Sequence, residues 1–155
     1  MKSSILRPLC ALTLLALLLG GCTARDGVSF SPAHGEVLLA SGAFDPSLEP
    51  VDLETAALLY GLEPDQLVDG VCYLAANTSV SADELAILVC KDEQAAQTAQ
   101  TALEQRVDSQ ITVSQSYCPA AIPHLEGAII QRTGNTVLLA VGEPTGVLDA
   151  IQSLQ

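Results

Sequence analysis

The sequence predicts an α+β domain with a four-stranded, mainly antiparallel sheet, made of two β-β-α units whose helices pack on one face. Short apolar runs bounded by turn residues occur in pairs, at 71–76 with 85–90 and at 128–131 with 136–141, as in β-hairpins. An acidic residue and a stretch of helical periodicity follow each pair. Two such units side by side form an antiparallel sheet with helices on one face.

Short helices are expected before the first hairpin. One lies between Ser31 and Gly42, with serine at the N-cap, proline in the first turn and glycine past the end. A second is expected over 52–60, where apolar residues recur at helical spacing. Glu63 and the following proline then start another turn or two, which end at Gly70.

The two β-β-α units supply the longer helices. Asp92 starts an alanine- and glutamine-rich helix that is expected to end near residue 107, and residues 109–123, with two prolines, are expected to be irregular. Glu143 starts the last helix. A carboxylate at either start accepts hydrogen bonds from free N–H groups and favours the positive end of the helix.

The N-terminus has the features of an export signal. Lys2 and Arg7 are followed by an apolar run over 9–19 and then by two glycines before Cys22. The run is about half of the ~20 apolar residues that a membrane-spanning helix needs. We therefore expect a signal peptide at 1–21, which is removed, rather than a permanent transmembrane segment.

The end of this run resembles the lipobox of bacterial lipoproteins. Leu19-Gly-Gly-Cys22 has the aliphatic residue, the two small residues and the cysteine of that motif. The resemblance implies a diacylglyceryl group on Cys22, cleavage just before it, and attachment to the extracytoplasmic face of the bacterial cell membrane. Two acyl chains on one residue suffice for stable anchoring. The alternative is an ordinary secretory signal with a chance cysteine.

Composition limits what the mature chain can bind. Removing 1–21 takes two of the six basic residues and none of the 18 acidic ones, which leaves a net charge near −14. Such a surface repels phosphate backbones and anionic headgroups, so nucleic acid is not an expected partner. The expected organisation is a lipidated cysteine with a flexible tether at 22–30 and a single α+β domain of unknown function at 31–155.

Three cysteines remain after cleavage and lipidation: Cys72, Cys90 and Cys118. An odd number cannot pair fully. In a hairpin with its turn near Asp83, Cys72 and Cys90 lie opposite each other, so a disulfide and two buried free thiols are both open. Their spacing matches no zinc pattern.

Several short segments after residue 60 share one further likeness: Tyr60-Gly-Leu62, Pro64, Val80-Ser-Ala-Asp-Glu-Leu-Ala-Ile87, Lys91-Asp-Glu93 and Tyr117-Cys-Pro119. In these segments the chain, from residue 60 to the C-terminus, resembles a family of short bacterial lipoproteins catalogued only as a domain of unknown function. The most specific piece is Ser81-Ala-Asp-Glu84, which leads into a strand. The family has no assigned activity, so the resemblance implies location and fold but no catalytic or binding residue.

No catalytic motif is recognisable. His124 and Glu126 could offer two ligands to a metal, but two ligands do not make a site. Cys118 with His124 could suggest a thiol and its base, although the sequence supplies no third orienting group. We therefore expect no cofactor and no metal, with Cys118 as a partly buried structural residue and His124 on a loop.

Adjacent acidic pairs suggest a glycosidase, which needs two carboxyls about 5–9 Å apart in a sugar-binding cleft. With no tryptophan and five aromatic residues, such a cleft is hard to build. Turn and helix-cap roles are the expected explanation of Asp83-Glu84 and Asp92-Glu93.

Three features suggest binding: the loop at 116–123 with an exposed Tyr117, an uncovered sheet face, and Phe30 with Phe44 beside the first helix. The expected function is a non-enzymatic binding or interaction module of the cell envelope, with an envelope protein or a small ligand as partner. The alternatives are an envelope hydrolase with an unrecognised active site and a ligand-binding accessory of a transporter.

Overall fold

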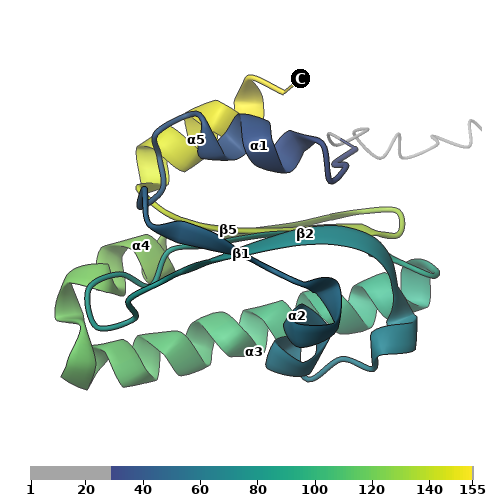
Figure 1. The fold of residues 1–155 in the computed structure, drawn as a ribbon, viewed down its shortest axis with the longest axis horizontal. Helices are drawn as coiled ribbons and strands as arrows, with labels where there is room; N and C mark the ends of the chain where they lie inside the picture. The colour runs from purple at the N-terminus through teal and green to yellow at the C-terminus, as the bar shows by residue number, and fades with distance from the viewer. Residues whose placement is uncertain (1–28, 155) are drawn as a thin grey trace, which may run out of the picture.

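The computed structural model describes residues 29–154, so the expected signal peptide at 1–21, Cys22 and most of the tether lie outside the described residues. Five antiparallel strands form one open sheet in the order β1-β2-β3-β5-β4 (Figure 1). The α+β class and the antiparallel sheet are confirmed, but the expected number of four strands is wrong. The strands are β1 (Leu48–Val51), β2 (Leu67–Ala75), β3 (Glu84–Cys90), β4 (Ile129–Thr133) and β5 (Thr136–Val141).

The strand missing from the sequence prediction is β1. It contains Glu49 and Pro50, which make its four residues look like a turn. Proline cannot donate to a strand ladder, so it is tolerated only where one side of the strand has no partner. β1 is such an edge strand, with Pro50 opposite Tyr73 of β2.

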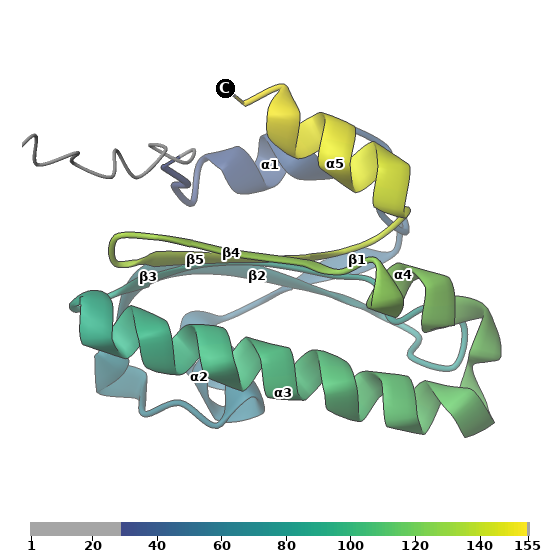
Figure 2. The ribbon, with the colours of Figure 1, turned by 180° about the vertical axis from the view of Figure 1, so that it is seen from behind.

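Helices cover both faces of the sheet, so the expectation that they pack on one face is wrong (Figures 1 and 2). α1 (His34–Leu39) and α5 (Pro144–Gln152) lie on one face. α2 (Leu53–Tyr60) and α3 (Glu93–Tyr117) lie on the other, with α4 (Ile122–Glu126) beside the end of α3. Single 3₁₀ turns precede β2 at Pro64–Gln66 and α4 at Pro119–Ala121.

The sheet separates two hydrophobic cores. Along β5, Val137, Leu139 and Val141 face the α2–α3 core, while Leu138 and Ala140 face the α1–α5 core. All six residues of β5 are buried. Successive side chains of a strand point to opposite faces, so a strand covered on both faces is apolar throughout. This explains the near-continuous apolar runs of the sequence.

The expected caps at Asp92 and Glu143 are confirmed, and Asp52 caps α2 in the same way. Asp52 accepts a hydrogen bond from the Thr55 N–H at 2.9 Å, and Asp92 accepts one from the Ala95 N–H at 2.7 Å. Glu143 caps α5 through the Gly146 N–H at 2.6 Å. Carboxylates at these positions satisfy donors that a helix leaves free.

The expected N-cap of the first helix is wrong. α1 begins later than the serine-proline signal indicates, with Ala33 at its N-cap. The Ser31 carbonyl instead accepts from the His34 N–H in the preceding turn. The short helix itself is confirmed.

α3 continues ten residues beyond its expected end near residue 107, so the prediction of an irregular segment over 109–123 is wrong. The added turns contain serine, threonine and β-branched residues, which are weak helix formers. Two of their hydroxyls bond carbonyls one turn back, Ser109 to Gln105 and Thr112 to Asp108. Ser114 is buried, so packing extends the helix. Within residues 29–154, no helix is both long and apolar enough to cross a bilayer.

β2 also begins earlier than expected, at Leu67, where the sequence predicted a helical turn. The actual register pairs Cys72 with Ala86 and Cys90 with Leu67. The expected juxtaposition of Cys72 and Cys90 is therefore wrong. Leu74 pairs with Glu84, so the centre of the hairpin turn lies nearer to β2 than Asp83 does, and every pair is shifted along β3. Both thiols are free and buried, as is that of Cys118.

Candidate functional site

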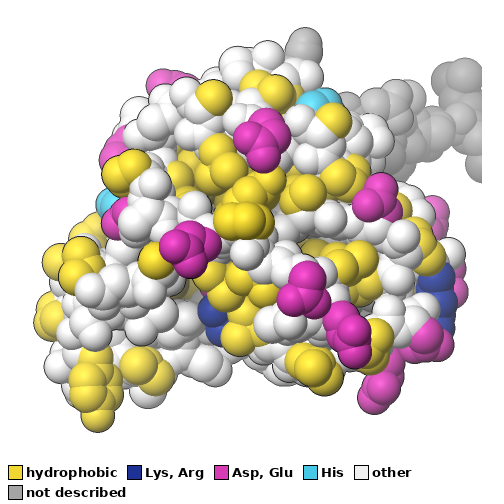
Figure 3. All heavy atoms as spheres, in the orientation of Figure 1, with side chains coloured by type: hydrophobic (Ala, Val, Ile, Leu, Met, Phe, Trp, Pro, Cys, Tyr) yellow, Lys and Arg dark blue, Asp and Glu magenta, His cyan; other side chains and the backbone are white. Residues whose placement is uncertain are grey.

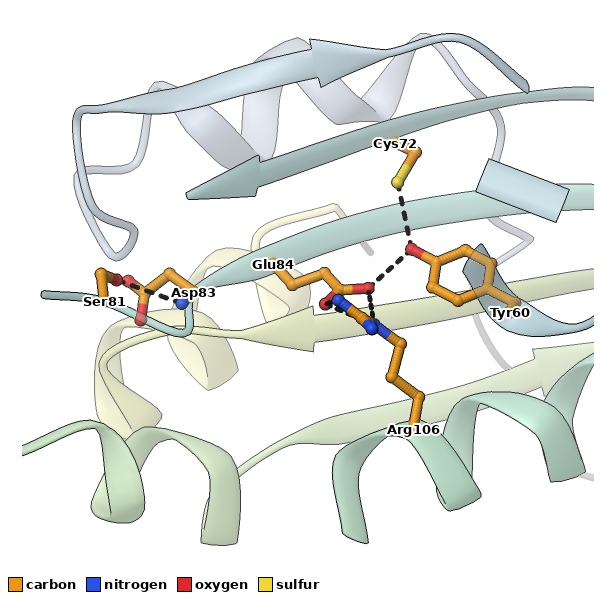
Figure 4. Close-up of polar contacts among 6 residues, drawn as sticks. All are labelled: Tyr60, Cys72, Ser81, Asp83, Glu84 and Arg106. Atoms are coloured by element: carbon orange, nitrogen blue, oxygen red, sulfur yellow. Dashed lines mark hydrogen bonds and ion pairs between the residues drawn. The ribbon is translucent and has the colours of Figure 1, made fainter. Parts of the chain in front are cut away.

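The neighbouring acids Asp83 and Glu84 stand where β3 begins, and they serve two different sites. Only 3 % of each residue is exposed. Figure 4 shows Asp83 beside Ser81 at the end of the loop, while Glu84 points toward Tyr60 and Arg106. The expected turn role therefore fits Asp83, whose N–H donates to Ser81 Oγ, and is wrong for Glu84.

Glu84 forms a buried ion pair with Arg106 of α3. The guanidinium Nε lies 2.8 Å from both carboxylate oxygens, and Nη2 lies 2.8 Å from Oε2. A two-pronged guanidinium–carboxylate contact of this kind is directional as well as strong. It fixes the middle of α3 against the start of β3.

Tyr60 and Cys72 extend this network from α2 and β2 (Figure 4). The Tyr60 hydroxyl donates to Glu84 Oε1 at 2.7 Å and lies 3.0 Å from the Cys72 sulfur. Since the single phenolic hydrogen is used on Glu84, the Cys72 thiol donates to the phenolic oxygen. The Arg106 guanidinium also lies 5.7 Å from the centre of the Tyr60 ring. Among the described residues, no buried side-chain nitrogen or oxygen lacks a partner.

The surroundings shift the acid–base properties of this network. Burial raises the pKa of Glu84, and the Arg106 charge with the hydrogen bonds only partly opposes it. Burial and the Glu84 charge raise the pKa of Tyr60. Burial raises the pKa of Cys72 to about 11. At neutral pH, Tyr60 and Cys72 are therefore neutral donors, and neither is an activated nucleophile.

The raised pKa of Glu84 predicts a pH-dependent contribution to stability. The folded chain binds this proton more tightly than the unfolded chain, in which the pKa is about 4.3. The contribution is fully present below that value and is lost as the pH rises through the folded pKa. We expect the difference in unfolding free energy, wild type minus Glu84→Gln, to be larger at pH 4 than at pH 7. Urea titrations at both pH values measure it, and equal differences would contradict the prediction.

The Cys72 thiol is expected to be nearly inert in the folded chain. With a pKa of about 11, well under about 1 % is thiolate at pH 8, and only 2 % of the residue is exposed. Maleimide labelling followed by peptide mapping should modify Cys72 at least about a hundredfold more slowly in buffer than in urea. Labelling at the same rate in both would show that the thiol is accessible.

Asp83 forms a hydrogen bond with His124 of α4. Its Oδ1 lies 2.7 Å from His124 Nδ1, and its Oδ2 accepts from the Asp45 N–H at 2.8 Å. A carboxylate only accepts, so Nδ1 carries the hydrogen and Nε2 of the neutral ring is left as an acceptor. Both residues line a surface cavity of about 300 Å³, with Ser81 and Glu143 among its other walls. An imidazole oriented in this way can take up a proton from a neighbouring group.

The other candidates from the sequence are not joined into one site. His124 pairs with Asp83 rather than acting as a base for Cys118, whose residue is buried at the end of α3. Across residues 29–154, no group of three histidine, cysteine or acidic side chains could hold a metal ion. Asp92 caps α3, and Glu93 lies in its first turn.

The three proposed binding features have different outcomes. Phe30 and Phe44 are buried in the α1–α5 core, so they dock the first helix. The uncovered sheet face does not exist, because α1 and α5 cover it. The expected exposed loop at 116–123 consists of the end of α3, a 3₁₀ turn and the start of α4, and Tyr117 in it is 76 % exposed as predicted.

Residues 40–142 match the model of a domain of unknown function, DUF4358. The chain belongs to this family. The match begins upstream of residue 60, where the resemblance started, and it ends before α5. It confirms the domain of unknown function, while the bacterial lipoprotein character of the chain stays a prediction. No curated protein and no solved structure matches the chain.

Proposed function

We propose that this DUF4358 protein is a lipid-anchored envelope protein whose domain binds another envelope protein or a small ligand without catalysing a reaction. The observation that carries the proposal is Leu19-Gly-Gly-Cys22, placed directly after a basic start and a short apolar run. The anchor is a diacylglyceryl group on Cys22, at the extracytoplasmic face of the bacterial cell membrane. A protein surface with a net charge near −14 does not attract anionic headgroups, so attachment to the membrane has to come from the lipid.

The position of the first packed residue supports a short attachment. Phe30 belongs to the α1–α5 core and only seven residues separate it from Cys22. Eight fully extended steps span at most about 28 Å. The proposed anchor therefore holds the domain close to the membrane, with the α1–α5 side attached to the tether.

The Cys22→Ala variant tests the anchor. We expect the tagged wild-type chain to fractionate with membranes and its N-terminal peptide to carry the diacylglyceryl mass. The variant should leave the membrane fraction entirely, because one lost thiol removes both acyl chains. Cys118→Ala is the matched control and should stay with the membranes. Equal fractionation of wild type and Cys22→Ala, with no lipid on the peptide, would refute the anchor.

A hydrolase that acts on envelope material is a second candidate, and the Asp83–His124 pair favours it. His124 Nε2 can accept a proton from water beside the 300 Å³ cavity. The test is a panel of chromogenic esters, amides and phosphoesters with the full chain. Activity lost in both His124→Ala and Asp83→Asn but kept in His34→Ala would support hydrolysis. Activity unchanged by His124→Ala would exclude this pair.

A further inference from the structure

A groove runs along the α2–α3 side of the domain. Two adjoining hollows, of about 380 and 520 Å³, share Tyr60, Gly61, Ala102 and Gln105 as walls. Large apolar side chains stand exposed beside them. Leu58 is 68 % exposed and Val113 is 51 % exposed. A row of this kind, exposed along two neighbouring helices, is typical of a surface that another protein covers.

The groove differs in charge from the rest of the protein. None of the described residues that line the two hollows is aspartate or glutamate, although the mature chain has 18 acidic residues. Arg106 is the one charged residue among those described there, and Glu84 neutralises it. Apart from Tyr60, the other polar side chains that line the two hollows are glutamine, serine and threonine, which form hydrogen bonds without charge. Protein interfaces have this composition at their centre, where charged residues are depleted.

Acidic residues flank the groove on the α2 side. Asp52 and Glu54, at the start of α2, are exposed. In Figure 3, hydrophobic side chains lie between α2 and the C-terminal half of α3, and Asp and Glu side chains lie over and around α2. An apolar strip with acidic residues on its α2 side complements a helix that is apolar on one face and basic beside that face.

The groove and the start of the described chain lie on opposite sides of the sheet. The described chain starts in the α1–α5 layer, whereas α2 and α3 lie on the other side of the sheet (Figures 1 and 2). A protein segment rather than the membrane is therefore in position to occupy it.

We propose that the α2–α3 groove binds a basic amphipathic helix of a partner protein, with the apolar face of that helix on Leu58, Leu59 and Val113. This inference rests on the proposed binding function and names the class of its partner. The net negative charge steers the basic segment toward the domain, and the apolar strip holds it in place.

Site-specific photocrosslinking in intact cells tests the proposal. A photoreactive amino acid replaces Val113 in the full chain, and in a control chain it replaces Leu148, which is 46 % exposed on α5. The crosslinked peptide is then sequenced. The proposal expects an adduct from position 113 only, with a segment that is basic and amphipathic at helical spacing. Adding Leu58→Glu should lower the yield about tenfold or more, because a charge is then buried in the apolar contact.

Other outcomes overturn the inference in distinguishable ways. A crosslink to the same chain would make the groove a contact between two copies. A crosslink to lipid, or to an acidic or non-helical segment, would contradict the partner class. Adducts from position 148 alone would support the binding function but show that the α2–α3 groove is not the binding surface. Adducts from neither position would overturn the groove as a protein-binding surface, while fractionation of Cys22→Ala would still report on the anchor separately.

Discussion

Replacing Glu84 by leucine should lower the free energy of unfolding by about 3 kcal/mol, the lower end of the cost of breaking a buried ion pair. The variant leaves Arg106 charged against an apolar surface and leaves the Tyr60 hydroxyl without its acceptor. The lower end applies because Arg106 also lines the α2–α3 groove and can turn toward solvent. Urea unfolding, followed by circular dichroism, measures the loss.

Two further variants separate the charge effect from packing. Glu84→Leu with Arg106→Met removes both charges, so the double variant should be more stable than Glu84→Leu alone. Asp65→Ala breaks the exposed Lys91–Asp65 contact, in which the side chains are 43 % and 79 % exposed. That change should cost no more than about 1 kcal/mol. A double variant less stable than Glu84→Leu would show that the unpaired guanidinium is not the cause.

Leu138→Ala and Leu139→Ala should each lower the free energy of unfolding by about 2–5 kcal/mol. Both residues are 0 % exposed, and they lie on opposite faces of β5 in the two separate cores. The pair therefore tests whether helices cover both faces. If α1 and α5 did not pack on the sheet, Leu138 would face solvent and its substitution would stay within about 0.5 kcal/mol. Val68→Ala, at a position 61 % exposed, is the surface control.

The parts of the fold that the sequence predicts depend on local signals. Asp52, Asp92 and Glu143 start helices because a carboxylate beside free N–H groups stabilises a helix wherever the helix packs. The β2–β3 and β4–β5 hairpins follow from alternating turn residues and apolar runs. The faces that helices cover depend on tertiary packing, so the location of α5 was not predictable from its own periodicity.

The candidate site depends on contacts between residues far apart in the sequence. Glu84 and Arg106 are 22 residues apart, and Asp83 and His124 are 41 apart. No spacing rule connects such pairs. One signal was present: at helical spacing, the basic residue Arg106 falls on the same side of its helix as Ala99 and Leu103, and a buried arginine requires an acidic partner. Which acidic residue is the partner follows only from how α3 packs against the start of β3.

The strand order has a consequence for how the protein is made. β5, the last strand synthesised, lies between β3 and β4, and α5 is needed to cover the face that α1 shares. In a nascent chain that lacks residues 136–152, the edge of β3 that pairs with β5 has no partner strand. The apolar sheet face that α5 covers is also exposed. Contacts of such long range form slowly and only when both partners are present. A chain built in this way cannot complete its sheet or its α1–α5 core until residues 136–152 are available.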